Sequence, residues 1–198
     1  MEAKIRFTKV REVKAPTRAN EGDAGLDFYI PTNLTVQQLK QANLAAENIT
    51  IGSLIGVGMV GCRINERGFI NTLVIGPHAR VRIPSGIKVL MEPRESMLMA
   101  ANKSGIAANK GLIFTSEIID SPYTGEMNLC ICNPGACSVH LNESFFENDE
   151  LKQKAIIQFI HVPIFDTTPE EISFKTFEDE SKDWGTRGEK GFSSSDPQ

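Results

Sequence analysis

The stretch ARVRIPSGIKVLME, residues 79–92, decides the fold class because it reads as two strands around a tight turn. Ala79–Ile83 and Ile87–Glu92 are short runs with alternating apolar side chains, the pattern of strands with one buried face. The PSG triplet at Pro84–Gly86 is a turn signal between them. These residues therefore predict β-structure.

Other runs extend this pattern along the chain. The further predicted strands are Lys4–Val10, Leu26–Ile30, Glu126–Cys132 and Ala155–Phe165, and SPYTG (121–125) and NPG (133–135) mark turns. Many short strands with Gly and Pro between them are typical of a sandwich, jelly roll or barrel rather than of alternating βαβ units. We therefore predict a mainly β fold in one domain, since 198 residues suffice for a single core.

One segment departs from the strand pattern. Thr35–Asn48 contains helix formers, and Thr35 with Gln38 fits a helix capping box. The apolar, glycine-rich residues that follow are compatible with strands that carry bulges or close backbone contacts. We interpret about 33–72 as an insertion in a β domain that spans 1–183, followed by a tail, 184–198.

Composition excludes several protein classes. The 21 Lys and Arg residues against 25 Asp and Glu give a net charge of −4, which does not favour a nucleic-acid-binding surface. The sequence contains no apolar run of membrane-spanning length and no signal-peptide pattern at its start. Four cysteines without framework spacing indicate reduced thiols. We expect a cytoplasmic protein that binds neither nucleic acid nor membrane.

The stretch SEIIDSPYTGE, 116–126, carries the strongest signal for chemistry. Asp120 follows an apolar pair and precedes a proline-containing turn. Such an aspartate often only caps a turn, but a carboxylate at a rigid strand end can also deprotonate water as a general base. Tyr123 would place a flat ring beside the same pocket, or serve only as a rim aromatic.

Three more stretches carry candidate ligand-binding groups. Lys103, Ser104 and Gly105 in NKSGIAANKGL combine a cation, a hydroxyl and an accessible backbone, which are the groups that hold phosphate oxygens. Asp27 lies within a strand in GDAGLDFY and either faces solvent or supports a metal-bound water. Gln158, in an otherwise apolar strand, is either structural or a ligand contact.

The tail WGTRGEKGFSSSDPQ, 184–198, is rich in Gly and Ser. By composition alone it resembles a frayed chain end.

Taken together and in this order, these stretches resemble the five motifs of the homotrimeric dUTPase family, the dUTP nucleotidohydrolases. The family motifs run approximately AGxDL, RSGLA, IDxDYRGE, GxRIAQL and RGxxGFGSTG. Here they read AGLDFY, NKSGIA, EIIDSPYTGE, KQKAIIQFIHVPI and TRGEKGFSSSD. The resemblance covers most of the chain apart from about 33–72.

The resemblance implies a distorted jelly roll or β-barrel of the dUTPase type, with a helix-containing insertion and a flexible C-terminal arm. It also implies a homotrimer with shared active sites, hydrolysis of dUTP to dUMP and pyrophosphate, and Mg²⁺ held mainly by the triphosphate. That reaction would limit uracil incorporation into DNA and supply dUMP.

Site residues carry over by position. Asp120 matches the carboxylate that activates water, Tyr123 the ring that stacks on the deoxyribose, and Asp27 the aspartate that supports water around Mg²⁺. The backbone of a hairpin around Phe114–Ile118 would read the uracil edge. The remaining substrate-binding positions that the resemblance implies are Lys103, Ser104, Gly105, Phe114, Thr115, Ile118, Gln158, Arg187, Gly191, Phe192, Ser193, Ser194 and Ser195. Arg187 would meet the γ-phosphate and Phe192 would cover the uracil.

Several positions depart from the family pattern. Lys103 replaces an arginine, so a point charge takes the place of a planar fork. Pro122–Tyr123–Thr124 stands where Asp-Tyr-Arg is usual, and Ala155 replaces the arginine of motif four. Ser193 and Asp196 replace glycines of motif five, and an inward-facing Asp196 would repel phosphate.

Two other functions remain open. Related dCTP deaminases carry a catalytic glutamate at the position that here is Cys130, which disfavours deamination. A binding or regulatory module would use the insertion at 33–72 as the surface for a protein partner, because long insertions are often functional.

Two further patterns are interpreted as structural. Cys130, Cys132 and Cys137 match no standard zinc spacing, even with His140, and are predicted to be small buried hydrophobes. PRES at 93–96 imitates motif two by its letters, but we interpret it as a turn before a strand.

Overall fold

The computed structural model describes residues 3–52, 55–149 and 151–182. The chain forms two compact units, 1–165 and 166–198. The strands are β1 (Lys4–Lys9), β2 (Gly25–Phe28), β3 (Ile49–Ile51), β4 (Val60–Ile64), β5 (Ile70–Ile75), β6 (Arg80–Pro84), β7 (Ile87–Glu92), β8 (Ser96–Ala101), β9 (Ile113–Phe114), β10 (Ile118–Asp120), β11 (Asn128–Cys132), β12 (Val139–Leu141) and β13 (Ile157–Pro163). The helices are α1 (Val36–Gln41), α2 (Ser104–Lys110) and α3 (Phe174–Ser181), with short 3₁₀ turns η1 (Ala46–Asn48) and η2 (Glu143–Phe145).

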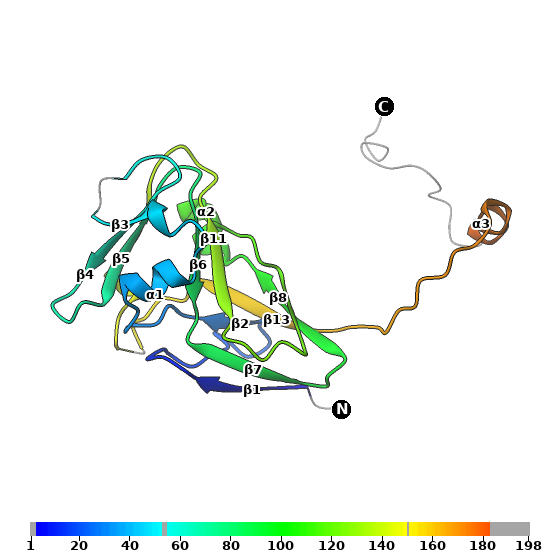
Figure 1. Cartoon of the computed structure of the whole chain (residues 1–198). Helices are drawn as coiled ribbons and strands as arrows, with labels where there is room; N and C mark the ends of the chain where they lie inside the picture. Colours follow the sequence, from blue (N-terminus) through cyan, green and yellow to red (C-terminus); the bar gives the residue numbers. More distant parts are fainter. Residues whose placement is uncertain (1–2, 53–54, 150, 183–198) are drawn as a thin grey trace. The chain divides into compact units, whose positions relative to one another are not determined.

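The first unit is mainly β, as the sequence predicts. Its strands form sheets in the orders β1-β7, β10-β8-β13-β2, β6-β11-β9 and β12-β5-β4-β3 (Figure 1). The pairs are antiparallel except for β3 with β4. The described strands are thus divided among small sheets and do not close into one barrel.

The predicted strands lie where local alternation placed them. The strand predicted at Ile87–Glu92 has the same bounds as β7, and its buried residues alternate with exposed or half-buried ones. PSG forms the turn between β6 and β7, and PRES precedes β8 as a turn. Gly86 in the first turn has a φ of +74°, and a Cβ there would lie 2.9 Å from Val13. Only glycine satisfies both conditions.

The insertion predicted at 33–72 contributes to the core. Thr35 and Gln38 form the predicted capping box at the start of α1, although the helix ends at Gln41 rather than near Asn48. The glycine-rich part forms β3 and β4, which pair with β5 at one end of the first unit (Figure 1). A Cβ at Gly61 would lie 2.4 Å from the carbonyl oxygen of Gly52, which is the close backbone contact expected there.

A continuous apolar core holds the sheets together. Residues of the insertion, such as Leu39 and Val60, belong to the same buried cluster as Phe28 and Phe159 from the central sheet. The rings of Phe28 and Phe159 pack edge to face with centroids 4.8 Å apart. The insertion is therefore stabilised by the same burial as the rest of the unit.

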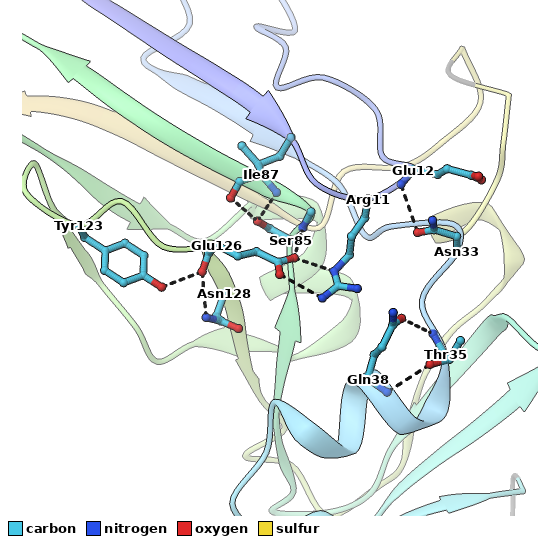
Figure 2. A network of polar contacts seen from close by, with 11 residues as sticks. Arg11, Glu12, Asn33, Thr35, Gln38, Ser85, Ile87, Tyr123, Glu126 and Asn128 are labelled. Carbon is cyan, nitrogen blue, oxygen red and sulfur yellow. Dashed lines mark hydrogen bonds and ion pairs between the residues drawn. The ribbon is translucent and has the colours of Figure 1, made fainter.

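The carboxylate of Glu126 joins three segments that are distant in sequence. It accepts hydrogen bonds from Arg11 Nε at 2.7 Å, from Arg11 Nη2 at 3.0 Å and from the backbone N–H of Gly86 at 2.7 Å (Figure 2). Only about a fifth of either side chain is exposed. Paired charges at this depth depend on one another, because removal of either leaves the other desolvated without compensation.

Two features differ from the sequence-based expectation. Ser104–Lys110 forms helix α2, which ends at Gly111 in the left-handed conformation with φ +66°, a C-terminal signal that the strand pattern obscured. The hairpin expected around Phe114–Ile118 does not form, because β9 pairs with β11 whereas β10 pairs with β8. Residues 115–117 instead carry the chain from one sheet to another.

The second unit is described only as far as residue 182. Its helix α3 begins after Ser173, whose side chain accepts a hydrogen bond from the N–H of Thr176. Phe174 and Phe177 of this helix are exposed. Among the described residues, no helix is long and apolar enough to cross a membrane.

All four cysteines are free thiols, in agreement with the prediction. Burial raises the pKa of Cys62, in the core, to about 12. Burial also raises the pKa of Cys130, against the opposing effect of the nearby Arg82 charge. Cys130 and Cys132 are half-buried and Cys137 is exposed, so the prediction that all three are buried is wrong for Cys137. The NPG turn places Cys137 in solvent.

The first prediction concerns the Glu126 network. Glu126→Ala should lower the free energy of unfolding by about 2–3 kcal/mol, because it leaves Arg11 and the Gly86 N–H without their acceptor. Chemical denaturation would measure this loss. The matched control is Arg6→Ala, which removes the exposed Arg6–Glu92 pair and should cost less than about 1 kcal/mol. Equal effects of the two substitutions would contradict the role given to Glu126.

The second prediction concerns thiol reactivity. The thiolate is the reactive form, so a raised pKa lowers the reactive fraction at neutral pH. Iodoacetamide should therefore label Cys137 first, Cys130 more slowly and with a rate that rises with pH, and Cys62 only after unfolding. Peptide mass spectrometry over a time course would resolve these sites. Labelling of Cys130 as fast as Cys137 at neutral pH would contradict the prediction.

Candidate functional site

An open pocket of about 260 Å³ lies beside the end of β10. Asp120 is the last residue of β10 and is exposed, and Tyr123 follows in the turn. Both side chains line the pocket together with Ile118, so three of the predicted site residues are brought together. The full lining is Arg82, Ser116, Ile118, Ile119, Asp120, Tyr123, Asn128 and Cys130.

The ring of Tyr123 is held in place before any ligand binds. Its hydroxyl donates a hydrogen bond to the carbonyl oxygen of Glu126 at 2.8 Å (Figure 2). The ring also passes directly over Gly125, where a Cβ would lie 2.4 Å from the Tyr123 hydroxyl oxygen. The glycine of the TGE sequence is therefore required for the ring to take this position.

The sheet β6-β11-β9 contributes a polar row to the same pocket. Arg82 on β6 pairs directly with Cys130 on β11, and the Cys130 thiol is hydrogen-bonded to the side chain of Ser116. Sequence reasoning did not assign Arg82 or Asn128 to this site. The alternation of β6 marked Arg82 only as exposed, and the pairing of β6 with β11 is non-local.

A second cluster gathers candidates from three other motifs. Asp27 on β2 forms an ion pair with Lys103, with Oδ1 2.5 Å from Nζ. Asp27 is nearly buried, so its carboxylate requires this cation. Gln158 on β13 lies opposite Asp27 in the strand register. Gly25 makes room for it, since a Cβ there would lie 2.5 Å from Gln158 Oε1.

Asn102 links this cluster to β9. Its backbone carbonyl oxygen accepts a hydrogen bond from Gln158 Nε2 at 3.2 Å, and its side-chain oxygen accepts one from the N–H of Phe114 at 2.9 Å. Ser104 and Gly105 follow at the exposed start of α2. Phe114 is buried whereas Thr115 is exposed. Sequence reasoning missed the linking role of Asn102.

The two clusters lie at opposite ends of β8 within one chain. Asp120 pairs with Met97 near the start of β8, whereas Gln158 pairs with Ala101 at its end. Four residues of extended strand separate these positions by roughly 13 Å. A single chain therefore does not place Asp120 beside Gln158 or Lys103.

The remaining candidates lie outside the described residues. These are Arg187, Gly191, Phe192, Ser193, Ser194 and Ser195. Among the described residues, no group of three or more His, Cys, Asp or Glu side chains is arranged to hold a metal ion. Asp27 is therefore considered below as a single carboxylate.

Comparisons with known proteins agree with these motifs. No model of a known protein family matches the chain. Two curated relatives are deoxyuridine 5′-triphosphate nucleotidohydrolases. The protein from Mycolicibacterium gilvum is 25% identical over 93% of this chain and 88% of its own length. The protein from Rhodococcus erythropolis is 25% identical over 93% of this chain and 80% of its own length.

Solved structures show the same fold. The dUTPase of Staphylococcus bacteriophage 80alpha with dUPNHPP superposes with a TM-score of 0.61, at 17% identity, over 98% of this chain and 99% of that protein. The dUTPase of phage phi11 of S. aureus, which has a species-specific insert, gives a TM-score of 0.56 at 15% identity, over 88% of this chain and 99% of that protein. Together with the motifs that the fold gathers into two clusters, these relatives identify the chain as a member of the dUTPase family.

Proposed function

We propose that this chain hydrolyses dUTP to dUMP and pyrophosphate. The observation that carries the proposal is the exposed carboxylate of Asp120, which shares a small pocket with the fixed ring of Tyr123 in a chain of this family. The curated relatives are named for the same reaction. In the cell, this activity would limit uracil incorporation into DNA and supply dUMP.

Asp120 would act as the general base. A carboxylate at the end of a paired strand is held rigidly, so it can orient a water and accept its proton as the water attacks the α-phosphorus. Tyr123 would stack on the deoxyribose and leave no space for a 2′-hydroxyl. The backbone of residues 114–118 would read the uracil edge, and Phe114, Thr115 and Ile118 would contribute its walls.

The second cluster would hold the triphosphate. Lys103 has three N–H donors, of which Asp27 uses one, so its ammonium can contact a phosphate oxygen while it still balances Asp27. The Ser104 hydroxyl and the first N–H groups of α2, including that of Gly105, have no acceptor within the helix. Gln158 would contact the α-phosphate region. The arm residues Arg187, Gly191, Phe192 and Ser193–Ser195 would close over the nucleotide.

A magnesium ion fits this arrangement as a partner of the substrate. Mg²⁺ retains several waters and binds phosphate oxygens, so one outer carboxylate such as Asp27 suffices on the protein side. When bound, the ion would neutralise charge that develops on the phosphates. The phi11 dUTPase has been described with a structural Mg(II) ion.

We further propose that each site is shared between copies of the chain in a threefold assembly. The support is the separation of the two clusters along β8, since Asp120 needs phosphate-binding groups that its own chain places roughly 13 Å away. A neighbouring copy would supply Lys103, Ser104 and Gln158. A protein partner at the insertion stays a prediction.

The third prediction tests the base. Asp120→Asn should reduce kcat for dUTP by a factor on the order of 10² to 10⁴, because the amide cannot accept the proton of water. The affinity for dUMP should change little, since the shape of the pocket is retained. Pyrophosphate release would measure the rate, and Glu47→Gln serves as an exposed carboxylate control. Full activity of Asp120→Asn would refute the assignment.

The fourth prediction tests the shared site. Asp120→Asn and Lys103→Met should each be inactive alone, but chains refolded together at equal amounts should regain activity. Random assembly gives about one quarter of the sites both intact residues if the two come from different copies. Pyrophosphate release from the mixture would report it. A mixture as inactive as its parents would show that each site is built within one chain.

A further inference from the structure

The pocket beside Asp120 contains a cation that the proposed reaction does not yet use. Arg82 lines this pocket, and among its lining residues it is the one with a positive charge. Within the described part of the chain, no carboxylate forms an ion pair with it. A guanidinium that faces a ligand pocket without an acidic partner is available to a ligand acceptor.

The insertion fixes Arg82 at three points. Asn43, which follows α1, accepts a hydrogen bond from the Arg82 N–H at 2.8 Å and donates one to the Arg82 carbonyl oxygen at 2.9 Å. The same amide donates to the carbonyl oxygen of Leu39 at 2.7 Å, which anchors it to the helix. Arg82 Nε donates in turn to the carbonyl oxygen of Ala42. Because Nε–H is used, the terminal N–H groups of the guanidinium remain for a ligand.

The order of residues along β11 shows which part of a nucleotide would meet Arg82. Tyr123 lies in the turn before β11, and Asn128 and then Cys130 follow along the strand on the pocket side. Arg82 lies directly opposite Cys130 and thus at the end of the pocket away from Tyr123. With the sugar on Tyr123, the atom of a pyrimidine that reaches furthest toward Arg82 is the substituent at C4, opposite the glycosidic nitrogen.

We propose that Arg82 is a specificity-determining contact that donates a hydrogen bond to the 4-carbonyl oxygen of uracil, and that Asn43 is its positioning residue. The proposal rests on the dUTP hydrolysis proposed above. Uracil presents an acceptor at C4, whereas cytosine presents an amino group. A cytosine would therefore face the guanidinium donor-to-donor, and the desolvated groups would stay unpaired. The insertion then contributes to base selection through α1.

The fifth prediction tests this contact. Arg82→Ala should lower kcat/KM for dUTP and weaken dUMP binding by a factor on the order of 10 to 100, the usual value of a hydrogen bond to a charged group. The preference for dUTP over dCTP should fall by a similar factor. Inhibition by pyrophosphate, which has no base, should not change. Asn43→Ala should shift the same quantities in the same direction by a smaller factor.

Controls separate this contact from folding and from the proposed activity. Arg80→Ala removes an exposed arginine on the same strand that does not line the pocket, and should leave all four quantities unchanged. Should Arg82→Ala fail to fold, Arg82→Gln, which retains neutral N–H donors, would test the same loss of preference for dUTP. Unchanged dUMP binding and base preference in the folded variant would overturn the inference, as would a loss of pyrophosphate inhibition, which would assign Arg82 to phosphate. A wild-type protein that neither binds dUMP nor hydrolyses dUTP would instead refute the proposed function.

Discussion

The ion pair between Arg11 and Glu126 determines how the N-terminal segment, the β6–β7 turn and the turn before β11 meet. Because the Glu126 side chain is engaged on the inner side, its backbone carbonyl oxygen is held where Tyr123 can donate to it. One carboxylate thus connects the stability of the fold to the orientation of a ring in the candidate site. A residue that sequence alone presents as one charge in a turn has both consequences.

How much of this could be predicted depends on the range of the interactions. The alternation in Ile87–Glu92 and the capping box at Thr35 are local, and the structure reproduces both. Helix α2 was missed because Lys103, Ser104 and Gly105 read as a loop, while the left-handed Gly111 that ends the helix was overlooked. The expected hairpin at 114–118 was wrong because which sheets β9 and β10 join is decided by partners far away in sequence.

The candidate site shows the same limit. Asp120 and Tyr123 were found because they lie three residues apart in one recognisable stretch, and they do line one pocket. Arg82 and Asn102 gave no comparable signal, since each acquires its place through pairing or hydrogen bonds between distant segments. Lys103 was expected to serve phosphate alone, but the nearly buried Asp27 also requires it. Charges that compensate one another across strands are the part of a site least visible in sequence.

The side chain of Asn43 has one more consequence, for the solubility of the protein. Strand β6 is the outer strand of its sheet, so its outward backbone groups could pair with a strand of another molecule. The amide of Asn43 occupies both outward groups of Arg82 and imitates the strand that is missing there. The end of α1 thus closes a sheet edge that would otherwise be a template for aggregation.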